Sequence, residues 1–409
     1  MSLPPYLSAH DISVLVDFGL FAATLACVAV FHRHTLAAAL TGLGVIILKK
    51  LLGTGFNEGP GFAGLFAHFA HEWVLIANLF LLLVGFALLA RHFEASRIPD
   101  WMPSALPDNW TGGFMLLVLV FVMSSFLDNI AAALIGATVS RHVFHGRVRV
   151  GYLAAIVAAA NAGGAGSVIG DTTTTMLWLA GVSPLSVLHA YVAAACALVI
   201  AGIPAARAQQ SYAPIVKSAP SGLRISYRHV AVVVFVLAAA IAANVGAHLL
   251  DPRILDEIPL IGLAVAAAIA ITVPIARPEW SLVPSAARGA LFLIALVSAA
   301  SMMPVKSLPL PSWETALGLG FVSAVFDNIP LTALAIKQGN YDWGFLAYAV
   351  GYGGSMIWFG SSAGVAVAGL MREARSTARW LAEGWPVIVA YAAGFFVMLA
   401  LLGWNPEPL

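Results

Sequence analysis

The chain reads Ser-Ser-Phe-Leu-Asp-Asn-Ile at residues 124–130 and Ser-Ala-Val-Phe-Asp-Asn-Ile at residues 323–329. Each stretch places an acid and an amide, Asp128-Asn129 and Asp327-Asn328, inside an otherwise apolar run. A charged side chain within a hydrocarbon layer costs several kcal/mol, on the order of 3 or more. An acid in such a run is therefore a candidate functional residue, and here the pattern occurs twice.

A glycine-rich polar break follows each of these stretches. The first break spans residues 161–172, the second spans residues 351–362, and their glycines fall at matching spacings. A glycine-rich interruption of an apolar run predicts a helix that is broken within the membrane. Because acid, amide and break recur in the same order, we interpret the chain as an internal duplication.

Composition places the chain in a membrane. It has 409 residues, of which 61% are hydrophobic and only 10% are charged, whereas soluble domains average about 25% charged residues. The net charge of +1 gives no reason to expect a nucleic-acid partner. We therefore predict an all-α polytopic membrane protein whose main partner is the lipid bilayer.

Two pairs of apolar segments are too short to span a membrane. They lie at residues 112–126 and 129–141, and at 313–326 and 329–338, and each segment falls short of the roughly 20 residues that a spanning helix needs. We predict two re-entrant hairpins with Asp128 and Asp327 at their tips. The interrupted segments 150–181 and 343–371 predict two discontinuous helices.

The order of elements predicts two inverted repeats. The first repeat covers residues 1–206, a cytoplasmic linker covers 207–228, and the second repeat covers 229–409. With the N-terminus outside, most Lys and Arg residues lie on the inner side, as the positive-inside rule requires. Only five of the 20 Lys and Arg residues remain outside: Lys49, Lys50, Arg253, Lys306 and Lys337.

Oxygen-bearing side chains surround three intramembrane acids, Asp128, Asp171 and Asp327. Hard cations prefer carboxylate, hydroxyl, amide and carbonyl oxygens, so we expect a sodium site in each half, where each tip meets its own broken helix. The expected sodium-binding residues are Asp128, Asn129 and Asp171 in the first half, and Asp327 and Asn328 in the second. An acid at a turn can also simply cap the next helix, and this alternative holds for all three. The remaining candidate ion- or substrate-binding residues are Ser124, Asn161, Thr172, Thr173, Ser323, Ser355, Ser361 and Ser362.

Two other polar groups have simpler interpretations. His68, His71 and Glu72 lack the spacing of zinc-hydrolase helices and are expected to form an interfacial cluster just before a helix. Lys49 and Lys50 close a helix and are expected to extend to the lipid headgroups.

At its four motifs the chain resembles the ion transporter superfamily, and within it the NhaD-type sodium/proton antiporters; citrate-transporter-like proteins share that superfamily. The resemblance rests on residues 124–129, 161–178, 323–330 and 353–364. It implies a homodimer with a scaffold and a moving transport part, hence an elevator-like mechanism. We further expect sodium and protons as the transported ions, no cofactor, and a location in a bacterial inner membrane.

The sequence favours a secondary active transporter, and first a sodium/proton antiporter in which sodium and protons compete for the same carboxyl groups. Burial favours the neutral form of a carboxyl group, which suits such an exchange. The alternative is a sodium-coupled carrier of a small carboxylate, such as citrate or a dicarboxylate, or of arsenite. Two anionic tips oppose a multivalent anion. No motif indicates an enzyme, and repeated broken helices suit alternating access better than a channel.

Overall fold

The computed structural model describes residues 9–31, 34–53, 55–56, 58–98, 100–101, 106–215, 224–250 and 254–409. Within these ranges the fold is helical, and seven helices are long and apolar enough to cross a membrane. The chain is therefore a polytopic membrane protein, as its composition predicts. Arg253 and residues 216–223 of the expected linker lie outside the described ranges.

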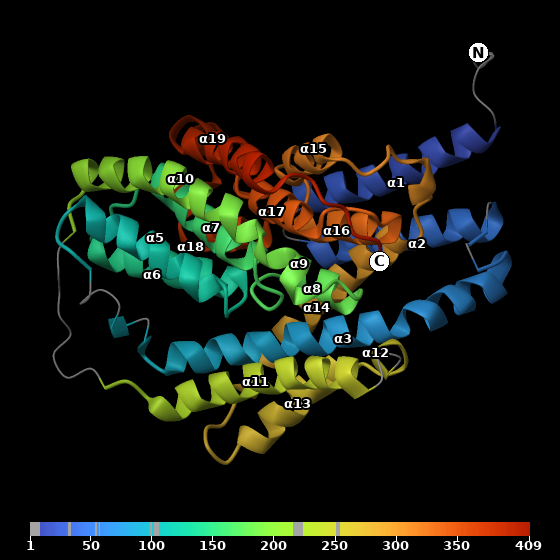
Figure 1. Ribbon diagram of the computed structural model, residues 1–409, viewed down its shortest axis with the longest axis horizontal. Coiled ribbons are helices and arrows are strands. Elements are labelled where there is room, and N and C mark those ends of the chain that lie inside the picture. Colours follow the sequence, from blue (N-terminus) through green and yellow to red (C-terminus); the bar gives the residue numbers. More distant parts are fainter. Residues whose placement is uncertain are drawn as a thin grey trace.

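The helices before the linker include four long ones, a short pair and a broken one. Most run roughly parallel to the long axis of the molecule (Figure 1). Their bounds are α1 Ala9–Val30, α2 Thr35–Leu52, α3 Gly61–Ala95, α5 Trp110–Ser124, α6 Asn129–Val143, α7 Val150–Ala165, α8 Thr172–Leu179, α9 Pro184–Leu188 and α10 Ala190–Tyr212.

The helices after the linker follow a similar order. A short pair is again followed by a broken helix and a long closing helix. Their bounds are α11 Tyr227–Leu250, α12 Ile254–Glu257, α13 Leu260–Thr272, η1 Trp280–Leu282, α14 Val283–Ser301, η2 Val305–Ser307, α15 Trp313–Ser323, α16 Asn328–Gln338, α17 Trp343–Gly353, α18 Ser362–Leu370, η3 Arg372–Arg375 and α19 Thr377–Leu402.

The helices pack into two groups. Helices α5–α7, α10, α15 and α17–α19 share the largest apolar core, which contains the fully buried Tyr348 and Phe395. Helices α1–α3, α11, α13 and α14 contact one another in a second group; Figure 1 shows α3, α11 and α13 along its lower edge. The groups meet where α8 and α16 pack against α3 and α14. This contact between the groups holds the candidate site.

A tight turn joins the two helices of each short pair, and each turn packs against a glycine-rich break. Segment 166–171 separates α7 from α8, and segment 354–361 separates α17 from α18. Gly170 lies against the backbone carbonyl of Ser124, and its counterpart Gly360 lies against the carbonyl of Ala324, so that a Cβ atom at either glycine would collide with that carbonyl. The breaks contain glycine at these positions because backbone meets backbone there.

Several features differ from the expectations. Helix α3 begins at Gly61, so His68, His71 and Glu72 lie inside it rather than before it. The carboxylate of Asp17 binds the Nζ atoms of Lys49 at 2.7 Å and of Lys50 at 3.0 Å. Both lysines are thus held in an ion pair between α1 and α2 and do not extend to headgroups, because a buried charge needs a partner.

Candidate functional site

Asp171 is the centre of the candidate site. It precedes α8 as the residue at its N-cap, yet its side chain makes no capping hydrogen bond. Instead, Asn129 Nδ2 donates to Asp171 Oδ1 at 3.0 Å, and Asn328 Nδ2 donates to Asp171 Oδ2 at 3.3 Å. One buried carboxyl group therefore joins the amides of both hairpin turns. The interactions of this carboxyl group thus extend well beyond the helix that it precedes.

Asn161 braces the two broken helices against each other. Its Oδ1 accepts from Asn129 Nδ2 at 3.0 Å, and its Nδ2 donates to Ser355 Oγ at 2.9 Å and Ser361 Oγ at 3.1 Å. These bonds use both hydrogens and the oxygen of the amide, and the side chain is fully buried. Its geometry fits a role in positioning Asn129.

Asp128 and Asp327 cap the helices that follow them. The backbone N–H of Ile130 donates to Asp128 Oδ2 at 3.2 Å, and that of Ile329 donates to Asp327 Oδ1 at 3.1 Å. The other oxygen of Asp327 accepts from Ser362 Oγ at 3.1 Å. Capping is thus present at both tips, and it uses a single oxygen of each carboxyl group.

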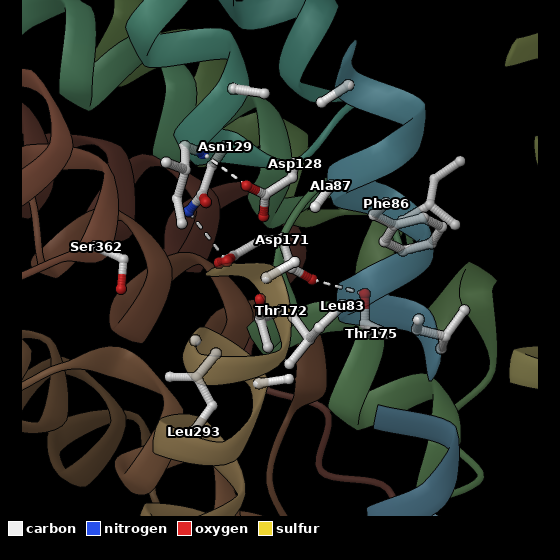
Figure 2. A pocket seen from close by; sticks show the side chains of 18 of the residues that line it. Leu83, Phe86, Ala87, Asp128, Asn129, Asp171, Thr172, Thr175, Leu293 and Ser362 are labelled. Atoms are coloured by element: carbon white, nitrogen blue, oxygen red, sulfur yellow. Dashed lines mark hydrogen bonds between the residues drawn. The ribbon is translucent and has the colours of Figure 1, made fainter. Parts of the chain in front are cut away.

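A cavity of about 420 Å³ connects part of this network to the surface. Figure 2 shows Asp128, Asp171 and Thr172 on one wall and Leu83, Phe86 and Ala87 of α3 opposite them. Its exposed end is lined by Arg91, Glu94 and Glu279. The guanidinium of Arg91 forms an ion pair with Glu94 Oε2 at 2.8 Å and with Glu279 Oε2 at 2.6 Å. The polar residues at the inner end of the cavity are Asp128, Asn129, Asp171, Thr172, Thr175, Asn328 and Ser362.

The other predicted site residues do not line this cavity. Ser323 Oγ donates to the carbonyl of Val350 at 2.7 Å, which ties α15 to α17. Ser124 and Thr173 are fully buried. The residues that line the cavity do not include Asp327, Asn161, Ser355 or Ser361.

Sequence inspection missed Thr175 and the charged residues at the cavity mouth. Thr175 Oγ1 donates to the carbonyls of Val168 at 3.0 Å and Asp171 at 2.9 Å, both in or beside the break. The run of four threonines after Asp171 was a usable signal, because hydroxyl groups satisfy carbonyls that a break leaves unpaired. Glu279 follows an apolar helix with no local pattern that indicates a site.

The arrangement offers oxygen ligands rather than a transition-metal cluster. Within the described ranges, no group of three or more His, Cys, Asp or Glu side chains could hold a metal ion, so the three predicted acids do not form one cage. Both amide hydrogens of Asn129 are used, which leaves its oxygen to face a cation. Two acids, amide oxygens and the Thr172 hydroxyl suit a weakly bound monovalent cation better than an anion.

The fold and this site have the features of an ion transporter, and comparison with known proteins agrees. A scan against protein-family models finds no match. Sodium/proton antiporter 1 of Arabidopsis thaliana is 25% identical over 414 aligned residues, covering 88% of this chain and 67% of the relative. Sodium/proton antiporter 2 of the same plant is 28% identical, covering 68% of this chain and 73% of the relative.

A bacterial protein shows a similar relationship. The Na+/H+ antiporter NhaD of Vibrio parahaemolyticus is 29% identical over 310 residues, covering 64% of this chain and 73% of that protein. These similarities confirm the resemblance to NhaD-type antiporters that the four motifs indicate. The names of all three relatives describe transporters, not enzymes. Because two of them are plant proteins, the bacterial inner membrane remains a prediction.

Proposed function

We propose that the chain is a secondary transporter that exchanges sodium for protons, with Asp171 as the carboxyl group that binds either ion. The observation that carries the proposal is the pair of amides, Asn129 and Asn328, that reach this one buried acid from two separate turns. The names of the three relatives support the same function. Sodium and protons are substrates here, and the proposal needs no cofactor.

The chemistry follows from competition at Asp171. In its charged form, the carboxylate binds sodium together with oxygens from Asp128, Asn129 and Thr172, which line the same end of the cavity. A proton that binds Asp171 removes the negative charge and releases the cation. If the site moves from one side of the membrane to the other only when it carries sodium or a proton, the two fluxes are coupled and no further coupling element is needed.

The finer mechanism is part of the proposal. Two inverted repeats are supported by the matching order of short pair, turn and broken helix in each half. Re-entrant hairpins are supported by the length of their arms, each 11 or 15 residues. An elevator-like movement is supported by the separation into two packed groups, and a homodimer by the resemblance alone.

The alternative of a carboxylate carrier finds less support. Asp128 and Asp171 both line the cavity, and two carboxyl groups repel a citrate or dicarboxylate ion. The one guanidinium at the mouth, Arg91, is already paired with Glu94 and Glu279. Among the described residues that line the cavity, none therefore offers an unpaired positive charge to a multivalent anion.

Everted membrane vesicles that contain the protein test the proposal. We expect sodium to dissipate an imposed pH gradient in the wild-type protein and to leave it intact in Asp171→Asn. A matched control is Glu314→Gln, which removes an exposed acid at the start of α15 and should retain wild-type exchange. An absence of response to every alkali cation in the wild-type protein would overturn the proposed function.

A further inference from the structure

A second cavity, of about 340 Å³, is lined by helices that also line the first. Its walls come from α3, α8, α14 and α16, the four helices at the contact between the two groups. Its charged lining consists of Glu58, Glu72 and Lys337, with His71 beside them. The proposed exchange at Asp171 does not use this cavity.

The helical register shows how the two cavities are related. On α3, Leu79 lines the first cavity and Leu75 the second; on α14, Leu293 lines the first and Val297 the second. Residues four apart lie on the same face of a helix, one turn from each other. The cavities are therefore consecutive along one face of both helices.

The helices on the opposite wall show the same register. Thr172 of α8 and Ile329 of α16 line the first cavity, while Met176 and Ala333 line the second. Each helix thus passes from one cavity to the other within four residues, a rise of about 6 Å. The layer between the cavities is apolar, since Leu79, Met176, Val297 and Ile329 belong to one buried cluster.

The two cavities open toward opposite ends of α3. Glu72 lines the second cavity and Arg91 the mouth of the first, and the rise between them along α3 is about 28 Å. This matches the thickness of a bilayer's hydrocarbon core, about 30 Å. Each mouth carries two glutamates and one basic residue, so each presents an excess of negative charge that attracts cations.

We propose that the second cavity is the entrance to Asp171 from the other side of the membrane, and that Leu79, Met176, Val297 and Ile329 form the seal between the entrances. The inference rests on the proposed exchange. A displacement of α8 and α16 by one helical turn along α3 and α14 brings Thr172 to the level that Met176 now occupies. Glu58 and Glu72 then become the carboxylates that a sodium ion meets first on that side.

His68 stabilises this entrance. It is buried in α3, and its ring nitrogens lie 3.1 Å from Glu58 Oε2 and 2.9 Å from Ser301 Oγ. It therefore links the segment before α3 to the end of α14. A position of this kind is structural, so His68 is not among the residues whose substitution tests the entrance.

Side-specific labelling tests the proposal without measuring transport. In a background of Cys27→Ser and Cys196→Ser, the variants Glu72→Cys and Ala87→Cys are treated with a positively charged, membrane-impermeant methanethiosulfonate in right-side-out and everted vesicles. We expect the two cysteines to be labelled from opposite sides. Ile336→Cys, also in the second cavity, serves if Glu72→Cys does not fold, and labelling of both cavities from the same side overturns the proposal.

Exchange measurements add a functional readout. In Glu72→Gln, the sodium concentration for half-maximal exchange should rise about tenfold when sodium is supplied on the side of the second cavity, and stay unchanged on the other side. An equal rise on both sides, or none, contradicts the proposed entrance. If the wild-type protein shows no sodium-dependent exchange, the proposed function fails, while the labelling result still decides where the cavity opens.

Discussion

Asn328→Ala tests whether the second turn acts on the acid of the first half. The substitution removes the 3.3 Å bond from Asn328 Nδ2 to Asp171 Oδ2. A hydrogen bond to a charged group contributes about 1.5–3 kcal/mol, and the length of this bond lies just beyond the usual range of roughly 2.7–3.2 Å. We therefore take the lower value, which corresponds to about a tenfold change in an equilibrium constant.

The direction of the change in sodium affinity follows from the competition between sodium and protons. The amide donates to the charged carboxylate and so favours the form that binds sodium. At near-neutral pH, Asn328→Ala should raise the sodium concentration for half-maximal exchange about tenfold. The assay is sodium-dependent dissipation of a pH gradient in everted vesicles at equal protein content. The control, Gln338→Ala, removes an amide from the far end of α16 and should behave as wild type.

Two results would refute this reasoning. An unchanged sodium dependence in Asn328→Ala would mean that Asp171 does not need the second turn. An equally large effect of Gln338→Ala would mean that α16 as a whole, and not this hydrogen bond, determines the affinity.

Four further substitutions probe the acids, the breaks and the frame. Asp128→Asn should reduce exchange in vesicles far more than Asp327→Asn, because only Asp128 lines the described cavity. Gly170→Ala forces a Cβ atom against a backbone carbonyl and should destabilise the protein by about 1–3 kcal/mol, seen as a lower Tm in detergent. Asp17→Ala leaves the buried Lys50 without its partner and should cost about 3–5 kcal/mol of stability, measured in the same way.

Each of these expectations has its own contrary outcome. Equal losses in Asp128→Asn and Asp327→Asn would show that the exposed cavity does not select between the acids. Gly369→Ala is the matched control for the break, since a Cβ atom there meets open space, and it should leave the Tm unchanged or slightly higher. A Tm equal to wild type in Asp17→Ala would show that the ion pair contributes little.

Much of the frame could be predicted from local patterns. Signatures within 40 residues of sequence mark the short pairs, the turns at Asp128 and Asp327 and the broken helices. The length of an apolar segment, compared with the thickness of a membrane, and its glycine content can both be read from a short stretch of sequence. The glycines mark the breaks in the sequence, although the reason for Gly170 and Gly360, the close approach of a second backbone, is seen only in the structure. The candidate acids were therefore found, although their distinct roles were not.

The rest depends on contacts between distant segments. The bond from Asn328 to Asp171 joins residues 157 positions apart, so the sequence suggested one site in each half rather than a shared acid. The ion pair of Asp17 with Lys50 likewise requires α1 to lie beside α2. The two cavities follow from the register of four helices that pack together only in the fold, and no single segment carries that information.

The most direct test of the central role of Asp171 is the number of protons released when sodium binds the purified protein. Isothermal titration calorimetry in buffers of different ionisation enthalpy measures that number. For the wild-type protein we predict that proton release rises toward one proton for each sodium bound as the pH is lowered, while the sodium affinity weakens, and we predict no sodium binding by Asp171→Asn. Sodium binding by Asp171→Asn with wild-type affinity and proton release would contradict the account.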